Sequence, residues 1–99
     1  MKMQDTTNLE KLSIDQINEQ MPHEWTISED NKSIYKEFKF KGYYKTIAFV
    51  NLLAWHAQDQ KHHPDLEVSF GKVLVKLTTH DVDGLSYKDL EMAKTINNI

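Results

Sequence analysis

Two short runs of alternating apolar and polar residues, at 66–70 and 73–77, constrain the fold of this chain more than any other feature. A period of two places every apolar side chain of a strand on the same face. The dipeptide between the runs, Gly71-Lys72, has glycine first, which is typical of a two-residue hairpin turn. We therefore expect an antiparallel hairpin in which Phe70 lies opposite Val73 and the apolar side chains share one buried face.

The expected register brings three histidines together. Beyond the strands it places His80 opposite His63, and His62 is the neighbour of His63 in the chain. A slip by one residue is disfavoured, because it would turn the apolar side chains of one strand toward the polar face of the other. We expect all three histidines to gather at one end of the hairpin, near the end of a long helix.

The rest of the chain shows patterns of the same kinds. Residues 23–40 predict a first hairpin, in which Trp25 and Ile27 share a face and a polar turn leads into a second alternating run. Three helices are indicated by apolar spacing or by capping boxes at their first residues. The helices are expected from Ser13, with Gln16 completing its box, to Met21; over residues 43–60; and from Ser86, with Asp89 completing its box, almost to Ile99.

These elements follow one another in the order α-β-β-α-β-β-α. That order favours an α+β fold, a two-layer sandwich in which a four-stranded antiparallel sheet carries three helices on one face. A chain of 99 residues is too short to divide into two domains, so we expect a single domain over residues 1–99, with about the first eight residues forming a flexible tail.

The long helix over residues 43–60 is apolar around much of its circumference. The residues expected to face the core are Tyr43, Ile47, Val50, Ala54 and Ala57, which recur at three- and four-residue intervals. Phe49, Leu52, Leu53 and Trp55 lie largely outside this stripe. An outer apolar face of Phe49, Leu52 and Trp55 suggests contact with another subunit, and we expect a homodimer or homotetramer.

Composition excludes several classes of function. The chain has no cysteine, so it can form neither a disulfide nor a thiolate zinc site, and a cytoplasmic location fits best. We expect no membrane role, because the N-terminus lacks the apolar run of a signal peptide and no stretch reaches the roughly 20 apolar residues that span a bilayer. With a net charge of −3 and no dense block of lysine and arginine, direct binding of nucleic acid is not expected.

Three interpretations of the histidines remain open from the residues alone. Pro64 pushes His63 toward an extended conformation, so His62 and His63 could simply occupy a solvated loop. A metal site is disfavoured, because consecutive histidines rarely bind the same ion and no spaced carboxylates complete the ligand set. Acid–base catalysis is the third option, since one imidazole can donate a proton near neutral pH while another accepts one.

The residues around the histidines carry the signature of a known family. The signature positions are His62-His63-Pro64, the aromatic Phe70, His80 and Asp89. Their order and spacing closely resemble those of the pterin-4a-carbinolamine dehydratases, also called 4a-hydroxytetrahydrobiopterin dehydratases, and the likeness extends upstream through residues 38–50 to Trp25. The family's four-stranded antiparallel sheet backed by three helices agrees with the fold that periodicity predicts.

The resemblance implies an enzyme that removes water from a 4a-hydroxytetrahydropterin to give a quinonoid dihydropterin. This step recycles the pterin cofactor of aromatic amino-acid hydroxylases, and it requires no metal and no cofactor of its own. By the same resemblance His62 and His80 transfer the protons, with the acid and base roles left open between them. His63 would bind and orient the pterin, as the third residue of the catalytic set.

The resemblance also implies substrate-binding roles for Pro64, Trp25, Gln58 and Lys88. Trp25 and Lys88 each have a simpler structural explanation, and Gln58 departs from the residue that many relatives have. Trp25 could equally be a core aromatic, and Lys88 a solvated lysine in the first turn of a helix. Gln58 stands where many relatives have glutamate, and an amide cannot favour a protonated imidazole as a carboxylate can. Asp89 is explained first as a helix cap.

A second function remains open on the same fold. Relatives are known that act as a coactivator's dimerisation cofactor or as assembly factors, so the resemblance also allows a non-catalytic binding protein. The physiological pterin and any link to a hydroxylase pathway are left undecided by the sequence.

Overall fold

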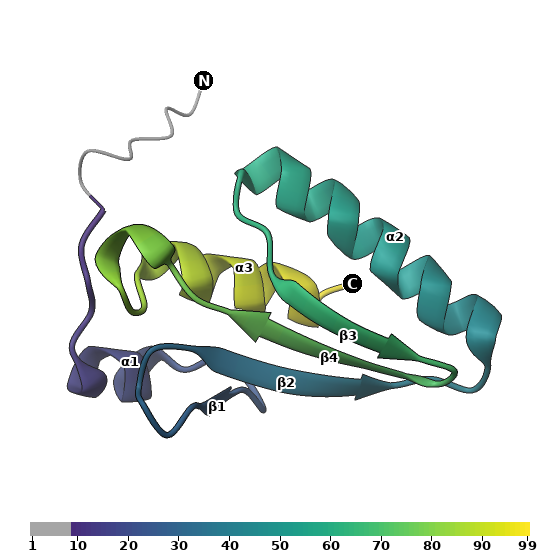
Figure 1. The fold of residues 1–99 in the computed structure, drawn as a ribbon, viewed down its shortest axis with the longest axis horizontal. Coiled ribbons are helices and arrows are strands. Elements are labelled where there is room, and N and C mark those ends of the chain that lie inside the picture. The colour runs from purple at the N-terminus through teal and green to yellow at the C-terminus, as the bar shows by residue number, and fades with distance from the viewer. Residues whose placement is uncertain (1–8) are drawn as a thin grey trace.

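The computed structural model describes residues 9–99, and the tail expected over the first eight residues lies outside them. Figure 1 shows the arrangement of the elements. They are α1 (Ile14–Gln20), β1 (Thr26–Ile27), β2 (Ile34–Lys39), α2 (Tyr43–Gln60), β3 (Asp65–Ser69), β4 (Lys72–Leu77), the 3-10 helix η2 (His80–Val82) and α3 (Tyr87–Asn97). Apart from η2, their order is the predicted one.

The four strands form one antiparallel sheet in the order β1-β2-β4-β3. One face of the sheet is buried in the core, where Ile34, Val73 and Val75 have no exposed surface. The residues that alternate with them, such as Tyr35 and Lys76, are exposed. The chain is therefore a two-layer α+β structure, with α2 and α3 in contact with each other and α2 also against β3 and β4. No helix within residues 9–99 is long and apolar enough to cross a membrane.

Both capping boxes predicted from the sequence are confirmed. At α1, the Ser13 side chain accepts from the Gln16 backbone N–H at 3.2 Å, and the Gln16 side chain accepts from the Ser13 backbone N–H at 2.8 Å. The same reciprocal pair joins Ser86 and Asp89 at the start of α3. Each box satisfies backbone donors that the first helical turn leaves without partners, and this sets where both helices begin.

The face that α2 turns toward the core differs from the predicted stripe. Its buried residues are Thr46, Phe49, Leu53 and Ala57, whereas Tyr43 and Ala54 are exposed. The ring of Phe49 packs 4.8 Å from that of Phe38 and 4.9 Å from that of Phe40, measured between ring centroids. Because the helix is apolar on several sides, periodicity could not select the face. Assigning Phe49 to the outer surface was wrong, while Leu52 and Trp55 are indeed exposed.

The hairpin of β3 and β4 forms in a register two residues from the predicted one. Its loop is Phe70-Gly71, and Ser69 pairs with Lys72 and Val68 with Val73. A shift of two residues keeps the apolar side chains of both strands on one face, since the pleat repeats every two residues. The prediction that this whole face is buried was wrong, because Val68 and Phe70 are 43% and 70% exposed. It does remove the pairing of His63 with His80, and both histidines lie beyond the paired strands.

A close backbone approach explains the position of the glycine in this loop. The carbonyl oxygen of Gly71 accepts from the backbone N–H of Phe40 at 2.8 Å. A Cβ atom on Gly71 would lie 2.8 Å from the carbonyl oxygen of Phe40, closer than such atoms can approach. Glycine is needed there because the chain that leaves β2 passes over the loop, a contact between distant segments that no turn rule contains.

Candidate functional site

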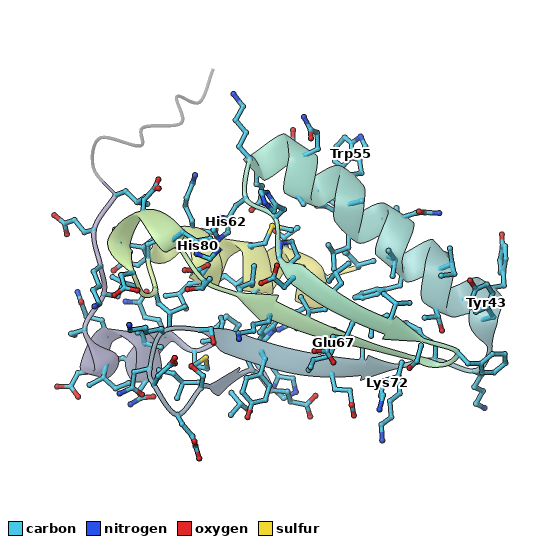
Figure 2. All side chains as sticks on the ribbon, viewed as in Figure 1. Tyr43, Trp55, His62, Glu67, Lys72 and His80 are labelled. Carbon is cyan, nitrogen blue, oxygen red and sulfur yellow. The ribbon has the colours of Figure 1, made fainter. Side chains whose placement is uncertain are left out.

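The three histidines come together at the end of the hairpin away from its loop. His62 and His63 follow the last turn of α2, where Lys61 adopts a left-handed conformation (φ 56°, ψ 39°) and lets the chain reverse toward β3. His80 follows β4 and opens η2. Figure 2 shows His62 and His80 close to one another beside α3. The predicted clustering is confirmed, although it arises from the two loops and not from strand pairing.

All three histidines line one cavity of about 170 Å³. The other residues that line it are Leu9, Lys61, Thr78, Thr79, Asp81 and Lys88. Lys88, predicted to bind substrate, is therefore placed with the histidines. The side chains of His63 and His80 are exposed, while the His62 side chain is only 11% exposed. One imidazole is held by the protein and two are open to a ligand.

His62 is held by Asp89. The Nε2 atom of His62 lies 2.6 Å from Oδ1 of Asp89, a residue with no exposed surface. The second oxygen of the carboxylate accepts from the Thr79 hydroxyl at 2.6 Å and from the Ser86 backbone N–H at 3.0 Å. Asp89 is thus both the predicted helix cap and a contact of the histidine. Oδ1 contacts His62, and Oδ2 accepts the hydrogen bond of the helix cap.

The hydrogen bonds of Asp89 decide which of the neighbouring hydroxyl groups is the donor in the bond between them. Because the Thr79 hydroxyl donates to Asp89, it must accept from the Ser86 hydroxyl, which lies 2.7 Å away. The Ser86 hydroxyl in turn accepts from the Lys88 backbone N–H. A carboxylate can only accept hydrogen bonds, so Oδ1 of Asp89 accepts one from the Nε2–H of His62 while Oδ2 accepts from Thr79 and Ser86. Within residues 9–99 the Nδ1 atom of His62 has no hydrogen-bond partner, so it is available to a ligand in the cavity.

A second, larger cavity adjoins the first. It measures about 550 Å³ and lies between α2 and β3, lined by Leu53, Ala54, Ala57, Gln58, Lys61, His63, Pro64 and Leu66. Lys61 and His63 line both cavities. Gln58 and Pro64, predicted to bind substrate, therefore line the adjoining cavity and not the one that holds all three histidines.

Trp25 does not take part in either cavity. Its side chain is buried, its Nε1 donates to Oδ1 of Asn97 at 2.9 Å, and its ring meets the ring of Phe38 edge to face at 6.2 Å. The interpretation of Trp25 as a core aromatic agrees with these contacts, whereas its role in binding the pterin stays a prediction.

The aromatic position of the signature, Phe70, also lies away from the histidines. It sits in the hairpin loop, 70% exposed, and its ring stacks on that of Tyr43 with centroids 6.3 Å apart. Figure 2 shows Tyr43 at the opposite end of the molecule from His62. Phe70 therefore lines neither of the two cavities near the histidines.

Sequence reasoning missed Thr79 and Lys61. Thr79 is buried beneath His62 and connects Asp89 with Ser86, yet a threonine at the end of a strand carries no local signal of that role. Lys61 directly precedes the histidine pair in the chain, and its place beside both cavities depends on the chain reversal after α2. Among the residues that the structure describes, no group of three histidines, cysteines or carboxylates could hold a metal ion.

Comparison with known proteins identifies the family. A sequence model of the family described as pterin 4 alpha carbinolamine dehydratase matches residues 10–99. A Legionella pneumophila (strain Corby) protein whose name assigns it to the pterin-4-alpha-carbinolamine dehydratases is 40% identical over 91 residues, covering 89% of this chain and 80% of that protein. A similarly named protein of Stenotrophomonas maltophilia (strain R551-3) is 49% identical over 65 residues, 66% of this chain, and the match spans 56% of the relative's length.

Solved structures agree with this fold. A transcriptional coactivator/pterin dehydratase from Brucella melitensis superposes with a TM-score of 0.86 at 27% identity, covering 90% of this chain and 97% of that chain. A pterin dehydratase-like protein identified as a RuBisCO assembly factor in the alpha-carboxysome gives a TM-score of 0.68 at 22% identity, with coverage of 77% and 88%, and it supports the fold alone. With a family match that extends from residue 10 to the last residue, this chain belongs to the pterin 4 alpha carbinolamine dehydratase family.

Proposed function

We propose that this protein is a dehydratase that converts 4a-hydroxytetrahydropterin into quinonoid dihydropterin, and that it thereby recycles the pterin cofactor of aromatic amino-acid hydroxylases. The observation that carries the proposal is the cavity lined by both His62, which is anchored by Asp89, and the exposed His80. Family membership supplies the substrate class. Two imidazoles that border one cavity support an acid–base reaction on a ligand bound there.

The reaction needs an acid and a base but no oxidant or reductant. The C4a–O bond breaks, and the departing hydroxyl group takes a proton from the acid to leave as water. The base removes the proton from N5, and the electrons of the N5–H bond form the N5=C4a double bond. Positioned acids and bases each contribute about 10²- to 10⁴-fold to the rate of such steps.

We assign the base to His62 and the acid to His80. The Nε2–H of His62 is directed at Asp89, so its free Nδ1 can accept the N5 proton, and the buried carboxylate then stabilises the imidazolium that forms. His80 has no side-chain hydrogen bond within residues 9–99 and is exposed, so solvent can restore its proton after each turnover. His63 and Lys88 would hold the pterin ring, while Pro64 and Gln58 would contact the part of the ligand that enters the adjoining cavity.

A direct assay tests this function. Freshly generated 4a-hydroxytetrahydropterin decays slowly by itself, and its decay is followed by ultraviolet absorbance with and without the protein. We expect the protein to accelerate the decay, and His62→Ala and His80→Ala each to remove most of the acceleration. His23→Ala is the matched control, because His23 is exposed and lines neither of these two cavities. Unchanged rates in both histidine variants would contradict the assigned roles.

A binding or assembly role is the second candidate, supported by a specific surface. Leu52 and Trp55 on α2 are 53% and 63% exposed, and Figure 2 shows Trp55 projecting away from the sheet. Exposed apolar residues on one helix favour a protein contact, either with further copies of the chain as a homodimer or homotetramer or with another protein. Light scattering after size-exclusion chromatography tests this idea. A strict monomer at high concentration argues against self-association, and an oligomer without dehydratase activity favours the second role.

A further inference from the structure

Lys61 lies where the two cavities meet, and it is not one of the signature residues of the family. The histidine cavity, at about 170 Å³, is smaller than the roughly 300 to 1,000 Å³ of pockets that enclose drug-sized ligands. The adjoining cavity, at about 550 Å³, lies within that range. Because Lys61 and His63 line both, a ligand whose reacting ring lies among the histidines can extend a substituent past Lys61.

Two lysines border these cavities, although the chain as a whole carries a net charge of −3. The carboxylate of Asp89 beside the histidine cavity is buried and already bonded to His62, Thr79 and Ser86. The adjoining cavity is lined by one permanently charged side chain, Lys61, and by no carboxylate. The histidine cavity adds Lys88 and one exposed carboxylate, Asp81. Neither lysine forms a salt bridge within 4.0 Å to any carboxylate in residues 9–99, whereas Lys32, Lys36 and Lys94 each do.

The backbone at Lys61 does not explain why a lysine occupies this position. Its φ of 56° lies in the left-handed region, where helix ends favour glycine or asparagine. The turn itself is made by the backbone N–H of Lys61, which donates to the carbonyl oxygens of Ala57 and Gln58. The side chain therefore contributes nothing to the turn and is left exposed, with its ammonium group free to meet a ligand.

We propose that Lys61 is a specificity residue that favours pterins whose side chain carries an anionic group, a carboxylate or a phosphate. The pterin ring would lie among the three histidines, and its substituent would pass Lys61 into the adjoining cavity, where the ammonium group binds the anion. This inference rests on the proposed pterin function and adds the chemical class of the substituent. A charge-assisted hydrogen bond of this kind is stronger than one between neutral groups, so it distinguishes charged from neutral side chains of similar size.

Equilibrium binding of stable oxidised pterins tests the proposal without turnover. The matched pairs are pterin-6-carboxylate with 6-hydroxymethylpterin, and neopterin phosphate with neopterin, each titrated calorimetrically. We expect tighter binding of the anionic member in at least one pair, which also identifies the preferred anion. Lys61→Gln should reduce that preference about tenfold, the factor that corresponds to about 1.4 kcal/mol. Lys61→Arg should retain it, and rising salt concentration should weaken it in the native protein.

Lys45→Gln is the matched control, because Lys45 is an exposed lysine of α2, the helix that ends before Lys61, and it lines neither cavity. Equal affinity for both members of both pairs would overturn the proposal, and so would a preference that survives Lys61→Gln. The dehydratase assay separates this result from the proposed function. Turnover without an anion preference would support the dehydratase function and contradict the role of Lys61. An anion preference without turnover would support the role of Lys61 and contradict the dehydratase function.

Discussion

The Nε2 atom of His62 lies 2.6 Å from Oδ1 of Asp89, so the first histidine of the pair is fixed by a buried carboxylate while the ring still borders a cavity. Thr79 and the backbone of Ser86 hold the carboxylate from the other side. The helix cap that begins α3 is thereby also the support of the candidate catalytic base. We therefore expect changes at Asp89 to affect both stability and the proposed activity.

Replacing the carboxylate should separate these two effects. Asp89→Asn keeps the size of the side chain but offers an amide in place of an oxygen that now accepts. We expect kcat to fall by about 100-fold or more, because the tautomer of His62 is no longer fixed. The free energy of unfolding should fall by about 1–3 kcal/mol, because a buried polar group loses its partner. Enzyme assays and urea denaturation measure the two, with Asp59→Asn, an exposed change near the end of α2, as the control. Full activity in the folded variant would contradict the orienting role.

Two alanine variants of α2 can test which face of this helix is buried in the core. Phe49→Ala should lower the free energy of unfolding by about 3–5 kcal/mol, because it leaves a cavity between the rings of Phe38 and Phe40. Leu52→Ala should change monomer stability by less than about 0.5 kcal/mol, since Leu52 is 53% exposed. Denaturation at low protein concentration makes the comparison. Equal losses in both variants would mean that the core face has been assigned incorrectly.

The close approach at the hairpin loop predicts a cost for a single methyl group. Gly71→Ala would place a Cβ atom 2.8 Å from the carbonyl oxygen of Phe40, so the loop or the end of β2 must move. We expect a loss of about 1–3 kcal/mol in the free energy of unfolding. Ser69→Ala, two residues earlier and exposed, should cost much less. Because the histidines lie at the other end of the hairpin, the residual folded protein should retain its activity per molecule.

Asp30 predicts a pH dependence in the turn between β1 and β2. The pKa of its carboxyl group lies below the ordinary value of 3.8, because the Ser28 hydroxyl and the Lys32 backbone N–H donate to it. Since the pKa is lowered by folding, ionised Asp30 stabilises the turn above pH 3.8, and this contribution disappears as the pH falls through the folded-state pKa. NMR titration should find the lowered pKa, and Ser28→Ala should return it toward the ordinary value. A pKa at or above that value in the native protein would contradict these contacts.

Several features of this protein follow from local sequence and were predicted from it. The capping boxes at Ser13 and Ser86 act within four residues, so they set the starts of α1 and α3 without any tertiary contact. The length of α2 and the faces of β3 and β4 follow from apolar periodicity for the same reason. The signature around His62 and His80 identified the family before any geometry was known.

Other features depend on contacts between distant segments, and local rules could not select them. Registers that differ by two residues leave the same side chains on the same faces, so periodicity does not distinguish them. The register that forms is the one in which Phe40 closely approaches Gly71. An α2 that is apolar on several sides has no preferred face until Phe38 and Phe40 pack against Phe49.

The candidate site shows the same division between local and tertiary determinants. The bond by which Asp89 caps α3 is local, so it could be predicted from the chain alone. The contact of its other oxygen with His62, 27 residues away, and the place of Lys61 beside both cavities depend on tertiary packing. The physical reason is that spacing along the chain specifies which side chains share a face, whereas the packing of α2 and α3 on the sheet decides which of those faces meet.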